Sequence, residues 1–460
     1  MIDKNIAKNI LAKALKSGGE FAELFIENRV INNIIVFNGK MDKSSSSLDY
    51  GLGLRIFNGT SAIYSYTNDL SELNLLKMAE TAASAINKKN IAQVLDFTMK
   101  KTETIHPIKI MPKDVSKKDI VDILKAGSEY SFKYNSKISE TTNTYLDDTQ
   151  EICIINSEGL WVEDKRVYTR VSFSAVASEG SEKQVGREAP GSHQGYELVS
   201  GLNIKELSEI AANTAITILG AGYAPKGKMP VVINKGFGGV IFHEACGHSL
   251  EATAIAKGAS EFTGKLGQQI ASSCVTAIDD GTIPNYWGSL NIDDEGTPTQ
   301  RNILIENGIL KSYLVDRLNG IKMGMPSTGS SRRQNYKYAP TSRMTNTFIA
   351  TGTDREEDII KDTEYGLYAH KMGGGSVQPA TGDYNFAVLE AYMIRNGKIA
   401  EPVRGATLVG KGAETLMLID KVANDEMQEQ GMCGSISGSI PANCGQPMIR
   451  VKEITVGGQN

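Results

Sequence analysis

The chain has 460 residues, of which 40% are hydrophobic and 22% charged, with a formal net charge of −4 at pH 7. This length favours two domains with substantial cores, and the slightly acidic balance excludes a general basic surface for nucleic acid. The five cysteines do not suggest a disulfide framework, no apolar run of about eighteen residues could span a membrane, and no secretory signal pattern is present, so we predict a cytoplasmic protein.

The first half of the chain alternates helical and strand-like segments. Apolar residues at helical spacing predict helices at 6–15, 70–87, 115–134 and 202–219. Alternating or apolar runs predict strands at 21–27, 31–37, 52–57, 140–145, 151–156 and 167–176. This alternation is typical of an α+β domain in which helices cover a twisted antiparallel sheet, and we assign the domain to residues 1–222.

A glycine-rich stretch, Gly220–Lys228, is the best candidate for a linker. Beyond it, residues 229–460 are predicted to form a β-rich domain in which one helix carries a histidine cluster. Its predicted strands are 229–234, 301–306, 310–316, 388–395, 406–409 and 448–456. Asn307–Gly308 and Asn396–Gly397 each separate two apolar runs and therefore predict tight β-hairpins. Gly431–Gly438, which contains a cysteine, is predicted to be a flexible loop.

The histidine cluster consists of His243, Glu244 and His248, in the pattern H-E-x-x-x-H. Neutral imidazoles are good zinc ligands, and a neighbouring glutamate can take a proton from water on the metal. On a regular α-helix, residues five apart point about 140° away from each other, so the two histidines could not share one ion. A single π-helical turn, closed by an i→i+5 hydrogen bond, would bring both onto one face. The spacing therefore indicates either a metal site built on a π-turn or a chance occurrence of two histidines.

Two imidazoles hold a metal ion poorly, so a third protein ligand is needed. Spacing alone does not choose among the candidates. They are Cys246, Glu251, Cys433 and Cys444, together with the remaining histidines His106, His193 and His370. Isolated histidines are more often structural than metal-binding, and Cys444, like Cys433, is predicted to lie in a loop.

One basic stretch could contact a substrate. Ser330–Arg333, with Arg343 nearby in the sequence, could bind a carboxylate or a phosphate. A solvated loop explains the same residues equally well.

Several further segments resemble one known family. They are Asp294–Arg301, Asp316–Asn319, Arg343–Asn346, Tyr365–Tyr368, Val403–Leu408 and the stretch from Cys433 to Gly458. With the histidine motif, they resemble the motif-bearing TldD branch of the TldD/PmbA family of zinc metallopeptidases. The likeness is densest from about residue 229 to the end, and in the first half it is clearest at Gly51–Phe57.

The resemblance implies a zinc-dependent peptidase in which His243, His248 and Cys433 hold Zn²⁺. Glu244 would be the catalytic general base that activates zinc-bound water for attack on a peptide bond. The position of Cys433 in the family motif selects it over the other cysteines. The resemblance also implies small, unfolded or extended peptides as substrates, and either a homodimer or a heterodimer with a related subunit that lacks the metal motif.

Three other functions are compatible with these residues. Cys433 could act as a nucleophile paired with His248, as in cysteine peptidases. The metal ion could have a purely structural role. The chain could also be a non-catalytic peptide-binding or regulatory protein, as the family's older description as a modulator of DNA gyrase suggests.

Overall fold

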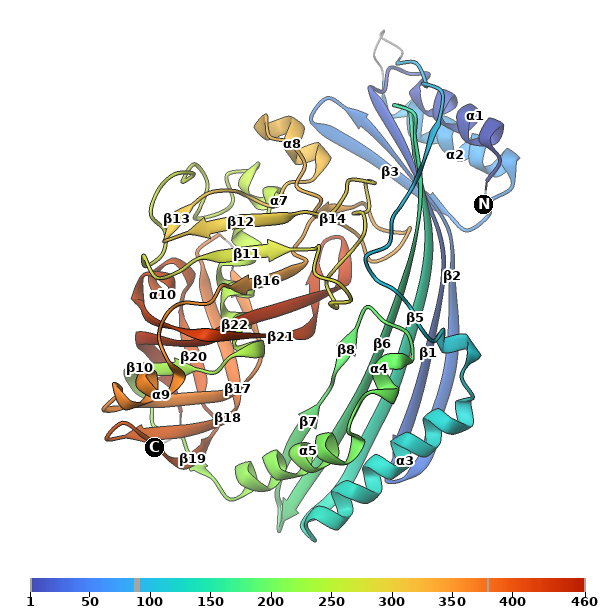
Figure 1. Cartoon of the computed structure of the whole chain (residues 1–460). Helices are drawn as coiled ribbons and strands as arrows, with labels where there is room; N and C mark the ends of the chain where they lie inside the picture. The colour runs from blue at the N-terminus through green and yellow to red at the C-terminus, as the bar shows by residue number, and fades with distance from the viewer. Residues whose placement is uncertain (1, 87–91, 379, 459–460) are drawn as a thin grey trace.

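Two large β-sheets, one in each half of the chain, organise the computed structural model (Figure 1). The structure describes residues 2–86, 92–378 and 380–458. The first sheet has eight strands and the second has twelve, and helices pack against both, which confirms the predicted α+β class. Within the described ranges, no helix is long and apolar enough to cross a membrane.

The first sheet is built from long strands whose central order is β3-β2-β1-β5-β6, with β4, β7 and β8 all paired to β6. The strands are β1 (Phe21–Phe37), β2 (Lys40–Asn58), β3 (Ser61–Thr67), β4 (Thr98–Lys101), β5 (Ile138–Asn156), β6 (Leu160–Glu179), β7 (Glu182–Glu188) and β8 (Gly191–Ser192). The predicted strands 21–27 and 31–37 are therefore one continuous strand, as are 140–145 and 151–156. Polar residues between the paired predictions interrupt the apolar pattern but not the backbone ladder.

Helices cover one face of this sheet at its two ends (Figure 1). They are α1 (Lys4–Leu15), α2 (Glu72–Ser84), α3 (Lys117–Tyr134), α4 (Glu197–Ser200) and α5 (Ile204–Leu219). The four predicted helices are confirmed to within a few residues, although Asn87, the predicted end of the second helix, lies outside the described residues. Side chains close the helix starts: Asp3 accepts a hydrogen bond from the Asn5 amide, and Asn203 accepts one from the Glu206 amide.

The second sheet is mixed and is centred on its longest strand, β22. Its strands are β9 (Gly222–Tyr223), β10 (Gly227–Ile233), β11 (Ala277–Asp280), β12 (Arg301–Glu306), β13 (Ile309–Leu310), β16 (Asn346–Ile349), β17 (Tyr365–Gln378), β18 (Asp383–Arg395), β19 (Lys398–Arg404), β20 (Thr407–Lys411), β21 (Ile419–Ser435) and β22 (Gly438–Gly457). A separate pair is formed by β14 (Ser331–Arg332) and β15 (Thr341–Ser342). The short helices of this half are α6 (Val240–Phe242), α7 (Ala252–Ile255), α8 (Arg317–Met323), α9 (Glu356–Lys361) and α10 (Gly412–Leu418).

The predicted hairpins are confirmed, but one predicted loop and one predicted strand are wrong. Asn307–Gly308 and Asn396–Gly397 have positive φ at both residues and connect paired strands. The segment 310–316 is strand only at its first residue. Gly431–Gly438 is not a flexible loop, because most of it forms the end of β21 and its turn into β22. Glycine and polar residues hide this hairpin from a pattern-based prediction, and pairing along β22 stabilises it.

The domain division at 1–222 and 229–460 stays a prediction. The chain leaves the first sheet through α5, and β9 within the predicted linker already pairs with β19 of the second sheet. Residues 1, 459 and 460, at the outer ends of the two predicted domains, lie outside the described residues.

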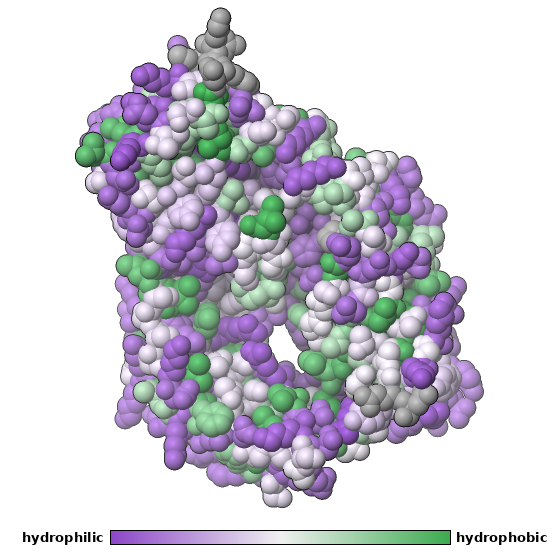
Figure 2. Space-filling view, turned by 180° about the vertical axis from the view of Figure 1, so that it is seen from behind, coloured by the Kyte–Doolittle hydropathy of each residue, from purple (hydrophilic) through white to green (hydrophobic). Residues whose placement is uncertain are grey.

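Buried charges and a small apolar cluster join the two halves. Arg55 contacts Glu295 at 2.6 Å, Arg166 contacts Asp294 at 2.8 Å, and all four side chains are almost fully buried. Phe25, Ile152, Ile154 and Val162 of the first sheet pack with Ile292 and Tyr336 of the second half. Removing one partner of a buried ion pair typically lowers the free energy of unfolding by about 3–5 kcal/mol. These contacts therefore fix the relative position of the two halves. Elsewhere an open passage separates them (Figure 2).

A glycine contact seats the histidine segment on β22. A Cβ atom at Gly239, just before α6, would lie only 2.3 Å from the carbonyl oxygen of Gly445. We therefore expect Gly239→Ala to lower the free energy of unfolding by about 3 kcal/mol, because backbone atoms must move to relieve the overlap. Gly374→Ala is the matched control, since a Cβ there meets nothing within 4 Å. Calorimetric unfolding of both variants tests this, and equal stability would contradict it.

We expect the contact between the two halves to depend on pH through the buried carboxyl group of Glu27. Glu27 accepts hydrogen bonds from Gln150 and from the Tyr336 amide, and burial raises the pKa of its carboxyl to about 7 from an ordinary 4.5. The folded state binds the Glu27 proton more tightly than the unfolded state does. This difference contributes fully to the free energy of unfolding below pH 4.5, and the contribution is lost as the pH rises through 7. The loss amounts to about 3 kcal/mol. In Glu27→Gln, the decline in unfolding temperature between pH 5 and pH 8 should be smaller than in the wild type; an unchanged decline would refute the assignment.

Candidate metal centre

The histidine segment is a run of three kinds of helical turn. α6 is followed by the π-helical turn η3 (His243–Gly247) and the 3₁₀ turn η4 (His248–Leu250). The His248 amide donates its hydrogen bond to the carbonyl of His243, which is the i→i+5 bond predicted from the spacing. Gly247 lets Met344 pack against this turn, because a Cβ there would lie 2.2 Å from the sulfur of Met344.

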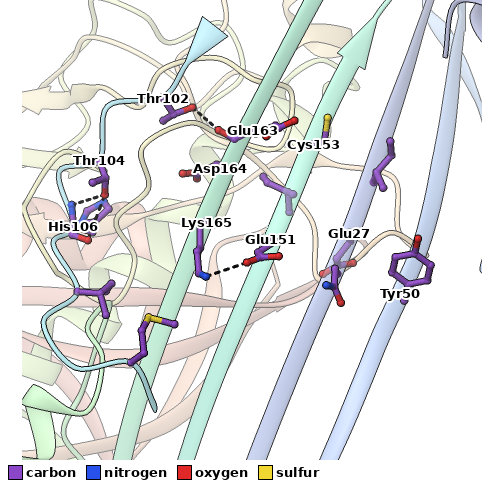
Figure 3. A pocket seen from close by; sticks show the side chains of 15 residues that line it. Glu27, Tyr50, Thr102, Thr104, His106, Glu151, Cys153, Glu163, Asp164 and Lys165 are labelled. Carbon is purple, nitrogen blue, oxygen red and sulfur yellow. Dashed lines mark hydrogen bonds and ion pairs between the residues drawn. The ribbon is translucent and has the colours of Figure 1, made fainter. Parts of the chain in front are cut away.

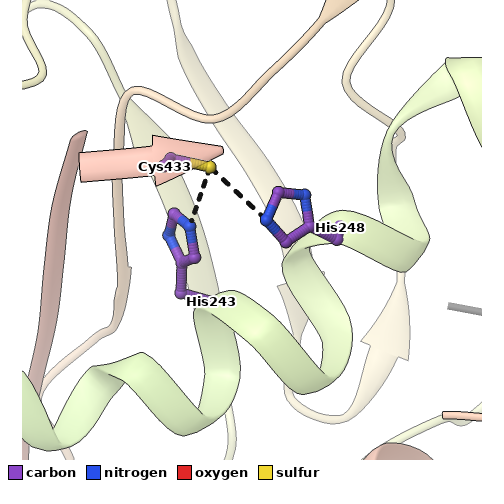
Figure 4. A group of neighbouring side chains, drawn as sticks. All are labelled: His243, His248 and Cys433. Carbon is purple, nitrogen blue, oxygen red and sulfur yellow. Dashed lines mark hydrogen bonds between the residues drawn. The ribbon is translucent and has the colours of Figure 1, made fainter. Parts of the chain in front are cut away.

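The π-turn brings both imidazoles to one cysteine (Figure 4). His243 Nε2 lies 3.2 Å and His248 Nε2 lies 3.4 Å from the Sγ atom of Cys433, which β21 contributes. The rings are nearly perpendicular, with an interplanar angle of 87°. All three side chains are buried, and their ligand atoms lie within 4.8 Å of one another.

The electrostatics of this group favour a negatively charged sulfur. Burial alone would raise the pKa of Cys433, but the adjacent His243 and His248 outweigh burial and hold that pKa well below its ordinary value. Burial likewise opposes protonation of His248, yet Glu251 and Cys433 raise its pKa to about 10. A thiolate beside two imidazoles is the form of these residues that a cation would bind, after the histidines release their protons.

These donors fit a divalent metal ion such as zinc. Two imidazole nitrogens and one thiolate form a known catalytic zinc set with a fourth position left open. With bonds of about 2.1 Å to nitrogen and 2.3 Å to sulfur, a tetrahedral ion separates such donors by roughly 3.6 Å, close to the 3.2 and 3.4 Å found here. In the described residues, His243, His248 and Cys433 are the only group with this arrangement.

Glu244 lies beside the group formed by His243, His248 and Cys433 and is not part of it. Its Oε2 atom is 3.8 Å from His248 Nε2, the same nitrogen that faces Cys433. The Glu244 side chain keeps 24% of its surface exposed, whereas the ligand side chains are buried. A carboxylate in this position can exchange protons with a molecule that approaches the open side of the group.

A second carboxylate orients His248 from behind. Glu251 Oε1 accepts a hydrogen bond from His248 Nδ1 at 3.1 Å, which leaves Nε2 free for a metal ion. Glu251 is therefore not the third ligand that spacing left open. Arg343, whose Nε is 3.9 Å from Glu251, also donates to the carbonyls of Cys433 and Gly438 and so connects the histidine segment to the β21–β22 turn.

Apart from Cys444, the other candidate ligands lie away from this group. Cys246 is buried in the hydrophobic core, and Cys444, predicted in a loop, lies on β22 near His243, where it contributes to that ring's raised pKa. His106 and His193 stack at 4.1 Å in the first half. His106 lines a cavity of about 740 Å³ beside the first sheet, and none of the three grouped residues lines that cavity (Figure 3). His370 lies next to Tyr368 and Glu390.

The basic stretch Ser330–Arg333 is not a solvated loop. Its residues and Arg343 are buried, and their guanidinium groups bind protein atoms: Arg333 contacts Glu23, and Arg332 donates to the carbonyl of Met344. Sequence reasoning missed the structural use of these arginines and the supporting contact of Glu251. The only available signal for Glu251 was its position three residues after His248, one helical turn away.

Three family models match the chain. Residues 22–86 match PmbA/TldA metallopeptidase domain 1, residues 110–219 match the central domain, and residues 226–458 match the C-terminal domain. The chain belongs to the PmbA/TldD family. It is a metallopeptidase, and the resemblance read from the sequence is confirmed, including the enzyme class. The metal it carries and the roles of individual residues stay predictions.

Named relatives agree with this assignment. Metalloprotease TldD homologs from Buchnera aphidicola (subspecies Acyrthosiphon pisum) and Haemophilus influenzae are each 34% identical to the chain, with 95% and 96% of this chain and 93% of each relative aligned. A metalloprotease of Methanothermobacter thermautotrophicus is 31% identical over 95% of this chain and 96% of its own.

Two solved structures share the PmbA/TldD fold. A Thermotoga maritima protein described as a candidate modulator of a DNA gyrase superposes with a TM-score of 0.79 at 22% identity, covering 99% of this chain and 100% of its own. TldE from Thermococcus kodakarensis superposes with a TM-score of 0.76 at 18% identity, covering 98% and 100%. At these identities the likeness concerns the fold alone.

The contact between Glu251 and His248 leads to a prediction about metal affinity. Glu251→Gln should weaken zinc binding about 10- to 100-fold, because the amide stabilises the imidazole ligand less than a carboxylate does. Glu306→Gln, an exposed glutamate in β12, is the control and should bind zinc like the wild type. Competition with a chromophoric chelator measures both affinities. Equal affinities would show that Glu251 does not support the ligand.

Proposed function

We propose that the chain is a zinc-dependent peptidase that hydrolyses peptide bonds in small or unfolded peptides. The observation that carries this proposal is the convergence of two imidazole nitrogens on the Cys433 sulfur, with the Glu244 carboxylate beside them. His243, His248 and Cys433 would hold the ion. When bound, a divalent metal ion lowers the pKa of water toward neutrality and polarises a carbonyl group.

Glu244 is the proposed general base. As water attacks the scissile carbonyl, the Glu244 carboxylate accepts a proton from that water and then donates it to the leaving nitrogen as the C–N bond breaks. Its partial exposure and its position 3.8 Å from His248 Nε2 support this role. Glu251 holds the His248 ring in place throughout and exchanges no proton with the substrate.

The free edge of β21 supports extended peptides as substrates. Among the described strands, β21 pairs only with β22, and Met432 lies opposite Pro441, which has no N–H group. Met432 and Pro441 therefore form a non-hydrogen-bonded pair of the antiparallel ladder, in which the Met432 amide and carbonyl face away from β22. Such pairs alternate with hydrogen-bonded pairs along the strand, so the amides and carbonyls of Gln430 and Gly434 also face away from β22. A peptide that pairs with this edge would be read through its backbone and would lie next to Cys433. Folded proteins rarely offer such a strand.

The proposal also covers the cellular compartment and the oligomeric state of the enzyme. We propose that it works in the cytoplasm, as a homodimer or as a heterodimer with a related subunit that lacks the metal motif. Because this chain carries the complete motif, it would be the catalytic subunit in either assembly. A regulatory or peptide-binding role without catalysis is the alternative that the next experiment separates.

The decisive experiment measures cleavage of an unstructured peptide mixture by mass spectrometry. Glu244→Gln should lower the cleavage rate by about 10²- to 10⁴-fold while metal content stays that of the wild type, since only proton transfer is lost. Glu306→Gln is the control and should cleave normally. Chelation should abolish cleavage by the wild type, and added Zn²⁺ should restore it.

Other outcomes would contradict the proposal in distinguishable ways. Cleavage that survives in Glu244→Gln and after chelation, but is lost on alkylation, would indicate Cys433 as a nucleophile. Loss of the folded state on chelation would indicate a structural metal. Peptide binding without cleavage by the wild type, alone or with a related subunit, would favour the regulatory role.

A further inference from the structure

Two arginines of the first sheet lie on its inner face, which faces the second half of the chain. Arg170 belongs to β6 and Arg187 to β7. A Cβ at Gly186 would lie 1.9 Å from the Ala211 carbonyl of α5, so position 186 faces the helices. Because successive residues of a strand point to opposite faces of the sheet, the Arg187 side chain points away from the helices. A Cβ at Gly191 would lie 3.2 Å from both Arg170 Cγ and the ring of Trp287, a residue of the second half.

This arginine pair, Arg170 and Arg187, has no ion pair with any carboxylate in the described parts of the chain. Arg187 Nε donates to the Ser172 hydroxyl at 2.8 Å, and the buried Nε of Arg170 has no hydrogen-bond partner there. Burial, together with the charge of Arg187, lowers the pKa of Arg170 to about 10. Two neighbouring cations, one of them half-buried, favour binding of an anion, since an anion relieves their repulsion and supplies the missing acceptors.

The arginine pair lies close to the proposed peptide-binding edge. Trp287 Nε1 donates to the Gly431 carbonyl at 2.8 Å, and the Gln430 side chain donates to the Ala189 carbonyl, between β7 and β8. Gln430 and Gly431 are two to three residues before Cys433 on β21. At about 3.3 Å per residue, the arginine-bearing end of the edge is roughly 10 Å from the metal ligands.

We propose that Arg170 and Arg187 bind a carboxylate group of the peptide substrate, about three residues from the scissile bond. This inference rests on the proposed peptidase function and specifies its substrate class. An extended peptide on the β21 edge would place one end beside the arginine pair, and guanidinium groups bind carboxylates through paired, charge-assisted hydrogen bonds. Backbone pairing provides broad recognition, and the carboxylate fixes the register of the peptide.

The carboxylate can come from the C-terminus of the peptide or from an aspartate or glutamate side chain. Both sources present the same planar anion, and an experiment can separate them. A peptide with a free C-terminus is compared with its amidated form, and an amidated peptide with an internal aspartate is compared with its asparagine form. All four carry a fluorophore at the N-terminus.

The test measures equilibrium binding by fluorescence anisotropy, using full-length zinc-loaded protein with Glu244→Gln to prevent cleavage. One carboxylate-bearing peptide should bind about 10- to 100-fold more tightly than its neutral partner. Arg170→Gln and Arg187→Gln should each remove most of that preference and leave the Kd of the neutral peptide unchanged. Lys183→Gln is the control, because it removes a charge from the same strand four residues away, where Lys183 pairs with Glu140.

Equal affinity for acidic and neutral peptides would overturn this proposal, as would an acid preference that survives both arginine substitutions, or no peptide binding at all. Arg187 is exposed, so Arg187→Gln should fold normally and keeps the test valid if Arg170→Gln is unstable. The failure of the proposed function can be distinguished from the failure of this inference. If the wild type cleaves no peptide but the binding preference depends on the arginines, the carboxylate site is supported and the peptidase reaction is refuted.

Discussion

One backbone hydrogen bond, from the His248 amide to the His243 carbonyl, determines whether the two imidazoles can act together. A regular helix would point residues with this spacing apart, whereas the π-turn directs both Nε2 atoms to the same sulfur. A π-turn is rarely stable alone, so its surroundings must hold it. Gly247 lets Met344 pack against the turn, and Gly239 lets the segment rest on the backbone of β22.

The proposed third ligand, Cys433, depends on a different part of the structure. Cys433 is near the end of a long strand whose turn is held by Arg343, and Arg343 also lies next to Glu251 behind His248. The two sides of the metal centre are thus connected by one buried guanidinium group. Because that group is fully buried and its partners are backbone carbonyls, a small shift of the hairpin would leave polar atoms unsatisfied. The contacts therefore hold His243, His248 and Cys433 close together in the folded chain.

The surroundings of the candidate metal centre are compatible with the proposed extended peptide substrate. The three grouped side chains are buried, Glu244 is partly exposed, and β21 offers an edge that no described strand pairs with beside them. The first sheet stands opposite, fixed by buried ion pairs such as Arg55 with Glu295, and an open passage remains between the halves (Figure 2). The arginine pair projects from that sheet toward the second half. In the proposed enzyme, both halves would contribute to one peptide-binding surface, with hydrolysis in the second half and charge recognition in the first.

The sequence alone determined much of this protein: the α+β class, the helices of the first half, the Asn–Gly hairpins and the need for a π-turn all follow from local spacing and turn chemistry. It also predicted that His243, Glu244 and His248 form one group, since these residues are close together in the chain. Features that depend on contacts between distant segments could be seen only in the folded chain. The tertiary structure brought Cys433 to the histidines across 190 residues, made a strand of a predicted loop through pairing with β22, and buried the arginines of Ser330–Arg333. Local sequence patterns do not show which distant segments contact each other, because those contacts are stabilised by burial and strand pairing that exist only in the folded chain.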